Sequence, residues 1–180
     1  MKKDIFSWQE FKPTILFLIK FIGIYIVGNL LYGFYIDHFD PRPDPITHEV
    51  SRETAWVLTL TGWPTFIQDH TMKPTTLLLH EEKSILAVYE GCNGINTMII
   101  FVAFILAFGP LKRTWLWFVP LGIVIIHLMN LLRIILLFYV SEYMPHFMYF
   151  THKYLFTASL YGVIFLLWLW WIKRYSIQRT

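Results

Sequence analysis

Long apolar runs, each closed by a polar or proline-rich break, dominate the chain. About 20 helical residues are needed to cross the hydrocarbon of a bilayer. The runs therefore predict membrane-spanning helices at about residues 14–36, 93–110, 114–140 and 153–173. The first run is too long for the apolar core of a signal peptide and lacks a small-residue cleavage site, so we expect it to be retained. This pattern indicates an all-α integral membrane protein of about four transmembrane helices, built as a single membrane domain over residues 1–180.

A long polar segment, residues 37–91, separates the first two predicted spans. Three prolines within five residues end the first helix, because proline fixes φ and lacks a backbone donor. Residues 46–63 have a loosely helical apolar pattern with a charged start, which favours an amphipathic helix lying on the membrane surface. A buried or re-entrant segment within residues 46–66 is the alternative. Two β-favouring runs, 75–80 and 85–90, are joined by Glu-Glu-Lys-Ser and predict a small β-hairpin.

Composition and charge agree with a bilayer environment. The chain is 56% hydrophobic and only 15% charged, and its formal net charge of +3 is not arranged as a phosphate-tracking stripe, which excludes nucleic acid as a partner. Basic residues instead gather at the ends of the apolar runs. These groups are Lys2, Lys3 and Lys12, then Lys112 and Arg113, then Lys173, Arg174 and Arg179. The positive-inside rule places them and both termini in the cytoplasm, and the acidic loop 37–91 outside.

The single cysteine, Cys92, lies at the expected outer end of the second span. One cysteine excludes an internal disulfide, a CxxC redox pair and a thiolate metal cluster. Flanking glycines permit a sharp turn, and a position on the first turn of a helix is expected to lower the thiol pKa. The alternative is that Cys92 is only a small apolar filler.

Two further polar residues are predicted to lie at the same membrane depth as Cys92. Arg133 is ~18 residues into the third span, or ~27 Å at ~1.5 Å per residue, and so lies near the outer face. A buried arginine in an apolar run indicates a functional site, although snorkelling to the interface is an alternative. His152 directly precedes the fourth span, and Asn130 lies one turn below Arg133, where it can orient the guanidinium. His127 is expected to pack rather than react.

The remaining histidines offer no metal-ligand spacing, so no metal and no other cofactor is predicted. With these residues located, the chain resembles the exosortase/archaeosortase family of membrane transpeptidases. The matching pieces are Glu90-Gly-Cys-Asn-Gly-Ile, Asn130-Leu-Leu-Arg-Ile, and His152 leading into an apolar helix. Their order and spacing match over roughly residues 85–175, and His152-Lys-Tyr-Leu-Phe with the short length looks most like the exosortase F branch. Many members have more spans, and Asn93 stands where serine is commoner.

The resemblance implies a cysteine peptidase or transpeptidase in a bacterial inner (plasma) membrane, with its site at the extracytoplasmic face. It would cleave C-terminal sorting signals of exported proteins, each consisting of a short motif, a transmembrane helix and a basic tail. Cys92 would form a thioester, His152 would transfer the proton, and Arg133 would stabilise the oxyanion. The supporting residues are Glu90, Asn93, Gly94 and Asn130. The alternative is a non-catalytic membrane subunit that uses Arg133 for helix pairing, and a role for His146 is left open.

Overall fold

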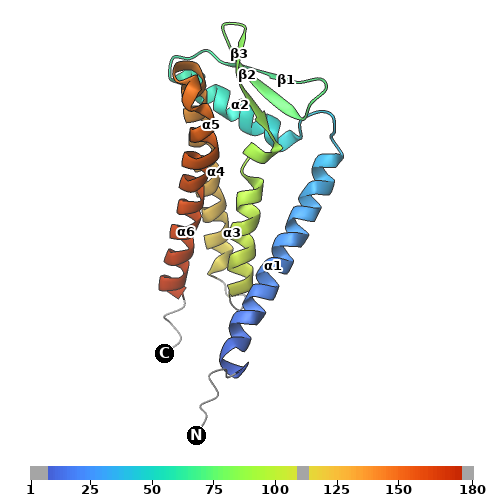
Figure 1. Cartoon of the computed structure of the whole chain (residues 1–180), viewed down its shortest axis with the longest axis vertical. Coiled ribbons are helices and arrows are strands. Elements are labelled where there is room, and N and C mark those ends of the chain that lie inside the picture. The colour runs from blue at the N-terminus through green and yellow to red at the C-terminus, as the bar shows by residue number, and fades with distance from the viewer. Residues whose placement is uncertain (1–7, 109–113, 176–180) are drawn as a thin grey trace.

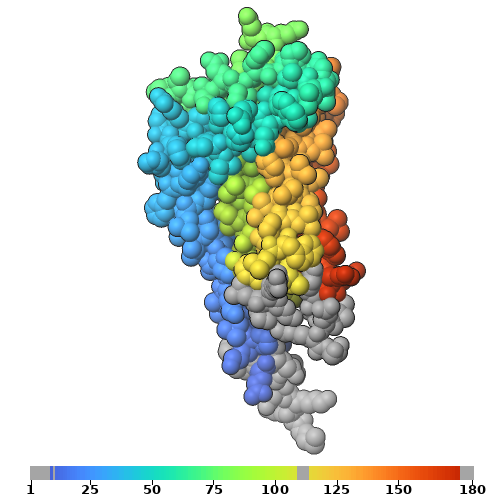
Figure 2. Space-filling view, turned by 180° about the vertical axis from the view of Figure 1, so that it is seen from behind, coloured from blue at the N-terminus to red at the C-terminus, as the bar shows by residue number. Residues whose placement is uncertain are grey.

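The computed structural model describes residues 8–108 and 114–175. Four helices form an elongated bundle: α1 (Trp8–Asp37), α3 (Ile95–Phe108), α4 (Trp115–Tyr143) and α6 (Phe156–Tyr175). A fifth helix, α2 (Pro45–Leu60), and a small sheet lie across one end of this bundle (Figure 1). Seen from behind, α2 and the segment that follows it form a cap over that end of the helices (Figure 2). The mainly helical fold with a small β element is as expected.

Three stretches among the described residues are long and apolar enough to cross a membrane: Phe11–Asp37, Trp115–Tyr143 and Pro145–Arg174. The second predicted span (93–110) corresponds to α3, which is apolar but has only 14 residues, and the end of that predicted range (109–110) lies outside the described residues. Large apolar side chains on α1 face outward, including Leu31 at 65% exposure and Phe34 at 71%. Such a surface is stable only against lipid, since water would penalise it. The chain is a membrane protein.

The helix bounds differ from the predicted ones at two places that matter for the site. Cys92 was expected on the first turn of the second span, but α3 begins only at Ile95 and Cys92 lies in the preceding 3₁₀ turn, η1 (Glu90–Cys92). His152 was expected before the fourth span. It lies instead inside a helical segment that starts at Met148 and includes a π-helical stretch, η3 (Thr151–Leu155). Neither shift is visible in the apolar pattern, because these short turns carry no periodicity of their own.

The predicted hairpin is present but belongs to a three-stranded antiparallel sheet, ordered β1-β2-β3. The strands are β1 (Phe66–Asp69), β2 (Thr75–His80) and β3 (Lys83–Tyr89). The turn between β2 and β3 contains only Glu81 and Glu82, both at positive φ (49° and 64°). Glycine or asparagine usually occupies such positions, so the glutamates gave no sign of so tight a turn. β1 was missed because it has only four residues.

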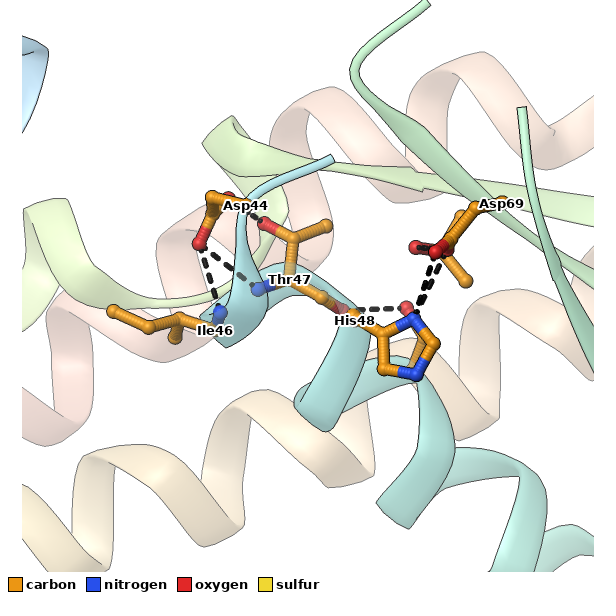
Figure 3. A network of polar contacts seen from close by, with 7 residues as sticks. Asp44, Ile46, Thr47, His48 and Asp69 are labelled. Carbon is orange, nitrogen blue, oxygen red and sulfur yellow. Dashed lines mark hydrogen bonds and ion pairs between the residues drawn. The ribbon is translucent and has the colours of Figure 1, made fainter. Parts of the chain in front are cut away.

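α2 begins at a conventional N-cap. Asp44 accepts hydrogen bonds from the backbone N–H groups of Ile46 (2.9 Å) and Thr47 (3.1 Å) (Figure 3). Pro45 takes the first helical position. Asp44 itself is fully buried. His48 of α2 also contacts Asp69 of β1 at 3.0 Å, which joins the helix to the sheet (Figure 3). The predicted helix at 46–63 is therefore present, with its buried face on the sheet and on α4.

The helix interface is close-packed around Gly122 of α4. A Cβ atom at Gly122 would overlap the ring of Phe101 from α3, and Phe101 is fully buried in a close-packed interior. Phe101 belongs to an apolar cluster that also contains Phe118, Ile126 and Ile164. The close approach of α3 to α4 therefore depends on a residue without a side chain.

We expect Gly122→Ala to lower the free energy of unfolding by about 1–3 kcal/mol, because the added methyl group over-packs a full interface. The measurement is the thermal unfolding midpoint in lipid nanodiscs. Gly23→Ala is the matched control: it is also a helical glycine, but nothing lies within 4 Å of an added Cβ, so the same change should be neutral or stabilising. Equal midpoints for the two variants would contradict the close packing of α3 on α4.

Candidate active site

The turn that carries Cys92 follows β3 directly. At both of its glycine positions, a larger residue would crowd a neighbouring side chain. A Cβ at Gly91 would overlap the ring of Tyr89, which lies against the glycine. Gly94 adopts a φ of +87°, and a Cβ there would come within 3.2 Å of the Asn130 side chain. The Gly-Cys-Asn-Gly turn thus allows both an aromatic ring and a helix to approach the cysteine closely.

Three side chains from different elements meet at the thiol. The Sγ atom of Cys92 lies 3.5 Å from Nε2 of His152 and 4.0 Å from Nη2 of Arg133. Cys92 comes from η1, Arg133 from α4, and His152 from the π-helical stretch η3. A π-helical turn widens the helix locally and is frequent at functional sites. The structure therefore brings together the three residues that the sequence placed at one depth.

Asn130 holds the backbone of this turn. Its Nδ2 atom donates to the carbonyl oxygen of Cys92 at 2.8 Å, and its side chain is fully buried. Asn130 was expected to orient Arg133, but its hydrogen bond goes to the backbone of Cys92. The Nε atom of Arg133 is buried, with no hydrogen-bond partner among the described residues. The guanidinium thus retains an unused donor next to the thiol.

Asn93 connects the turn to two other helices. Its Nδ2 atom donates to Tyr32 Oη of α1 at 2.5 Å and to Thr47 Oγ1 of α2 at 3.0 Å. Its Oδ1 atom accepts from the N–H of Ile95 at 3.0 Å, at the start of α3. Asn93 was expected as a supporting residue, whereas Tyr32 and Thr47 were not predicted from the sequence. No local pattern reveals them, since each is separated from Asn93 by tens of residues and acts only through tertiary contact.

The network continues from Thr47 to the N-cap of α2. Thr47 Oγ1 donates to Asp44 Oδ2 at 2.5 Å (Figure 3), and Tyr32 Oη donates to the carbonyl oxygen of Glu90 at 3.4 Å. Glu90, expected as a supporting residue, takes part through this backbone carbonyl. Its carboxylate atom Oε2 is buried without a partner among the residues the structure describes.

A cavity of about 500 Å³ opens beside the thiol. Cys92 and His152 lie on its wall, together with residues of β3, α4 and the short segment η2 (Pro145–Phe147). Apart from His152, the residues that line it are uncharged. This volume lies within the range of ligand pockets. A reactant can therefore reach the thiol from an apolar chamber.

The electrostatics of the thiol differ from the expectation. Burial raises the pKa of the Cys92 thiol above its ordinary value, and this effect exceeds the opposing influence of the Arg133 charge and of hydrogen bonding from Tyr89. The expected lowering by a helix N-terminus is wrong, since Cys92 precedes α3 and is only 5% exposed. At rest the thiol is protonated and needs a base.

The other histidines lie apart from this site. His127 pairs with Glu53 of α2 (Nε2 to Oε2, 2.7 Å). His146 is exposed in η2, and its neighbours Pro145 and Met148 line the cavity in its place. The described ranges contain no group of three or more histidine, cysteine, aspartate or glutamate side chains that can hold a metal ion.

The pH at which the alkylation rate of Cys92 reaches half its plateau should therefore lie above the ordinary pKa of a free thiol, because the thiolate is the reactive form. Arg133→Gln should move this profile further toward high pH, because loss of the positive charge removes stabilisation of the thiolate. The measurement is the rate of iodoacetamide labelling of the purified chain across a pH series. Arg52→Gln, an exposed arginine paired with Glu49, is the control and should not shift the profile. A labelling rate already at its plateau below neutral pH would contradict this account.

Comparison with known proteins identifies a family for this chain. A family model described as transmembrane exosortase (EpsH) matches residues 13–172 of the chain. No curated protein and no solved structure matches it. The match covers most of the chain, from the first turns of α1 to the end of α6, and includes all three residues that meet at the thiol. The chain belongs to the transmembrane exosortase (EpsH) family.

Proposed function

We propose that this chain is a cysteine transpeptidase that cleaves C-terminal sorting signals of exported proteins through a thioester at Cys92. The observation that carries the proposal is the 3.5 Å distance between Cys92 Sγ and His152 Nε2, with Arg133 Nη2 4.0 Å from the same sulfur. A nucleophile, a base and a group that can stabilise an oxyanion are the parts that acyl transfer uses, and Cys92, His152 and Arg133 can supply them. Membership of the exosortase family supports the same substrate class.

The chemistry follows from these three groups. His152 Nε2 takes the thiol proton as the sulfur attacks the scissile carbonyl carbon, and the S–C bond forms. Arg133, which cannot lose its proton, stabilises the negative oxygen of the tetrahedral intermediate. The C–N bond then breaks, His152 returns the proton to the leaving amine, and a thioester remains on Cys92. An acceptor amine or water attacks this thioester, which releases the product and restores the thiol.

A raised thiol pKa suits this order of events. A buried, neutral Cys–His pair avoids the cost of holding separated charges in an apolar site before substrate arrives. Proton transfer then coincides with attack, when Arg133 balances the new negative charge. Asn130 and Asn93 position the turn by holding the Cys92 carbonyl and the start of α3.

The same proposal includes the orientation of the chain. The site and the sheet lie at one end of the bundle, and the first residues of α1 and the last of α6 lie at the opposite end (Figure 1). With spans at about 14–36, 93–110, 114–140 and 153–173, the basic groups face the cytoplasm of a bacterial inner membrane and the site faces outward. The motif His152-Lys-Tyr-Leu-Phe supports assignment to the exosortase F branch.

Cys92→Ala and His152→Ala should each abolish processing of tailed exported proteins, with a loss of about 10³-fold or more, because neither group has a substitute in the site. The measurement is quantitative mass spectrometry of source-cell membranes, in which unprocessed proteins retain their C-terminal helix and basic tail. Lys83→Ala is the control, since Lys83 is an exposed β3 residue that pairs only weakly with Glu142 at 3.7 Å. Normal processing by a stably expressed Cys92→Ala chain would favour a non-catalytic membrane subunit.

A further inference from the structure

One edge of β3 is open. The sheet order β1-β2-β3 places β2 against one edge of β3, and no described strand pairs with the other. Near the start of β3, Ser141 Oγ of α4 donates to the carbonyl oxygen of Ile85 at 2.8 Å, which closes that part of the outer edge. From Leu86 onward the outer edge faces no strand. An open edge is a template for pairing with another chain.

The cavity runs along this edge. It is lined by Leu86, Ala87 and Val88, three consecutive residues of β3. Successive side chains of a strand point to opposite faces, so a cavity that touches all three lies at the side of the strand, where its backbone groups are. Since β2 occupies the inner side, the cavity lies along the outer edge of β3.

The far wall and the end of the cavity complete a channel for an extended chain. Ile134 and Leu137 of α4 contribute to its wall, as do Pro145, Met148 and Tyr149. β3 continues without a break into η1, so the edge leads to Cys92, and His152 lies on the same cavity. A peptide that follows this edge therefore delivers a backbone carbonyl to the thiol.

We propose that the sorting-signal segment next to the scissile bond binds as an added strand on the outer edge of β3. This inference rests on the proposed function, because the chemistry of Cys92 and His152 identifies the occupant as a peptide that is to be cleaved. Strand addition holds a substrate mainly through backbone hydrogen bonds, and alternate side chains enter the cavity. The uncharged lining around Leu86, Val88 and Ile134 selects against a charged side chain at those alternate positions.

The test places a photo-crosslinking benzophenone amino acid at Ala87, and separately at Tyr89, in the full Cys92→Ala chain expressed in its source cell. Both side chains are exposed and lie two residues apart on one face of β3. The control position is Phe66, which is 71% exposed on β1, the opposite edge of the sheet. The probed partners are the exported proteins that end in an apolar helix and a basic tail, and the attached residue is located by mass spectrometry.

We expect crosslinks to the sorting segment from Ala87 and Tyr89 and none above background from Phe66. Moving the probe by two residues on β3 should move the attachment by two residues on the substrate, as paired strands require. If the benzophenone lowers the amount of folded chain, Ala87→Cys is made in the same Cys92→Ala background and labelled with a photoactivatable maleimide. This probe also tests whether the sorting segment lies against β3.

The outcomes separate this inference from the proposed function. Processing that requires Cys92, together with absent crosslinks at β3 or attachments without the two-residue shift, overturns strand addition and leaves the transpeptidase intact. Shifted crosslinks together with Cys92-independent processing overturn the transpeptidase and keep the strand site. Cys92-independent processing together with absent or unshifted crosslinks overturns both the transpeptidase and the strand-addition proposals.

Discussion

The structure depends on the hydrogen bonds that hold the turn around Cys92. A buried polar group without a hydrogen-bond partner costs about 1–3 kcal/mol. Two asparagines supply partners for the backbone of this turn and link it to its surroundings. Asn130 binds the Cys92 carbonyl, and Asn93 binds Tyr32, Thr47 and the first N–H of α3. Through these contacts α1, α2, α3 and α4 all converge on one turn, and the position of the thiol is set by the packing of the whole molecule.

Burial and charge act against each other at this thiol. Burial raises the pKa of Cys92, while the Arg133 guanidinium and the hydrogen bonding of Tyr89 lower it. Burial prevails, so the thiol is held neutral beside a histidine and a fixed cation. In the proposed reaction, the positive charge is in place before a negative charge forms on the substrate oxygen, so little reorganisation is needed. The Nε atom of Arg133 has no hydrogen-bond partner among the described residues, so it is available to donate to a bound substrate.

The bilayer stabilises the helices of this fold, whereas the sheet bounds the site. Lipid supplies the environment for the outward-facing apolar surface of α1, and the interior cluster around Phe101 holds α3 to α4 and α6. The cap of α2 and three strands then encloses the site at one end of the bundle. Within this cap, β3 both bounds the cavity and leads to Cys92. A strand edge beside a buried thiol joins peptide recognition to the chemistry proposed for it.

The sequence by itself determined the membrane class, the helix at residues 46–63, the hairpin and the residues that meet at the site. These follow from apolar run length, proline positions, alternation and the three short motifs, all of which are local. The tertiary structure decided the rest. Only packing brings Tyr32 and Thr47 to Asn93, turns Asn130 toward the Cys92 carbonyl and adds β1 to the hairpin. The direction of the Cys92 pKa shift was also decided there, because burial depends on which residues surround a group and a linear pattern does not contain that information.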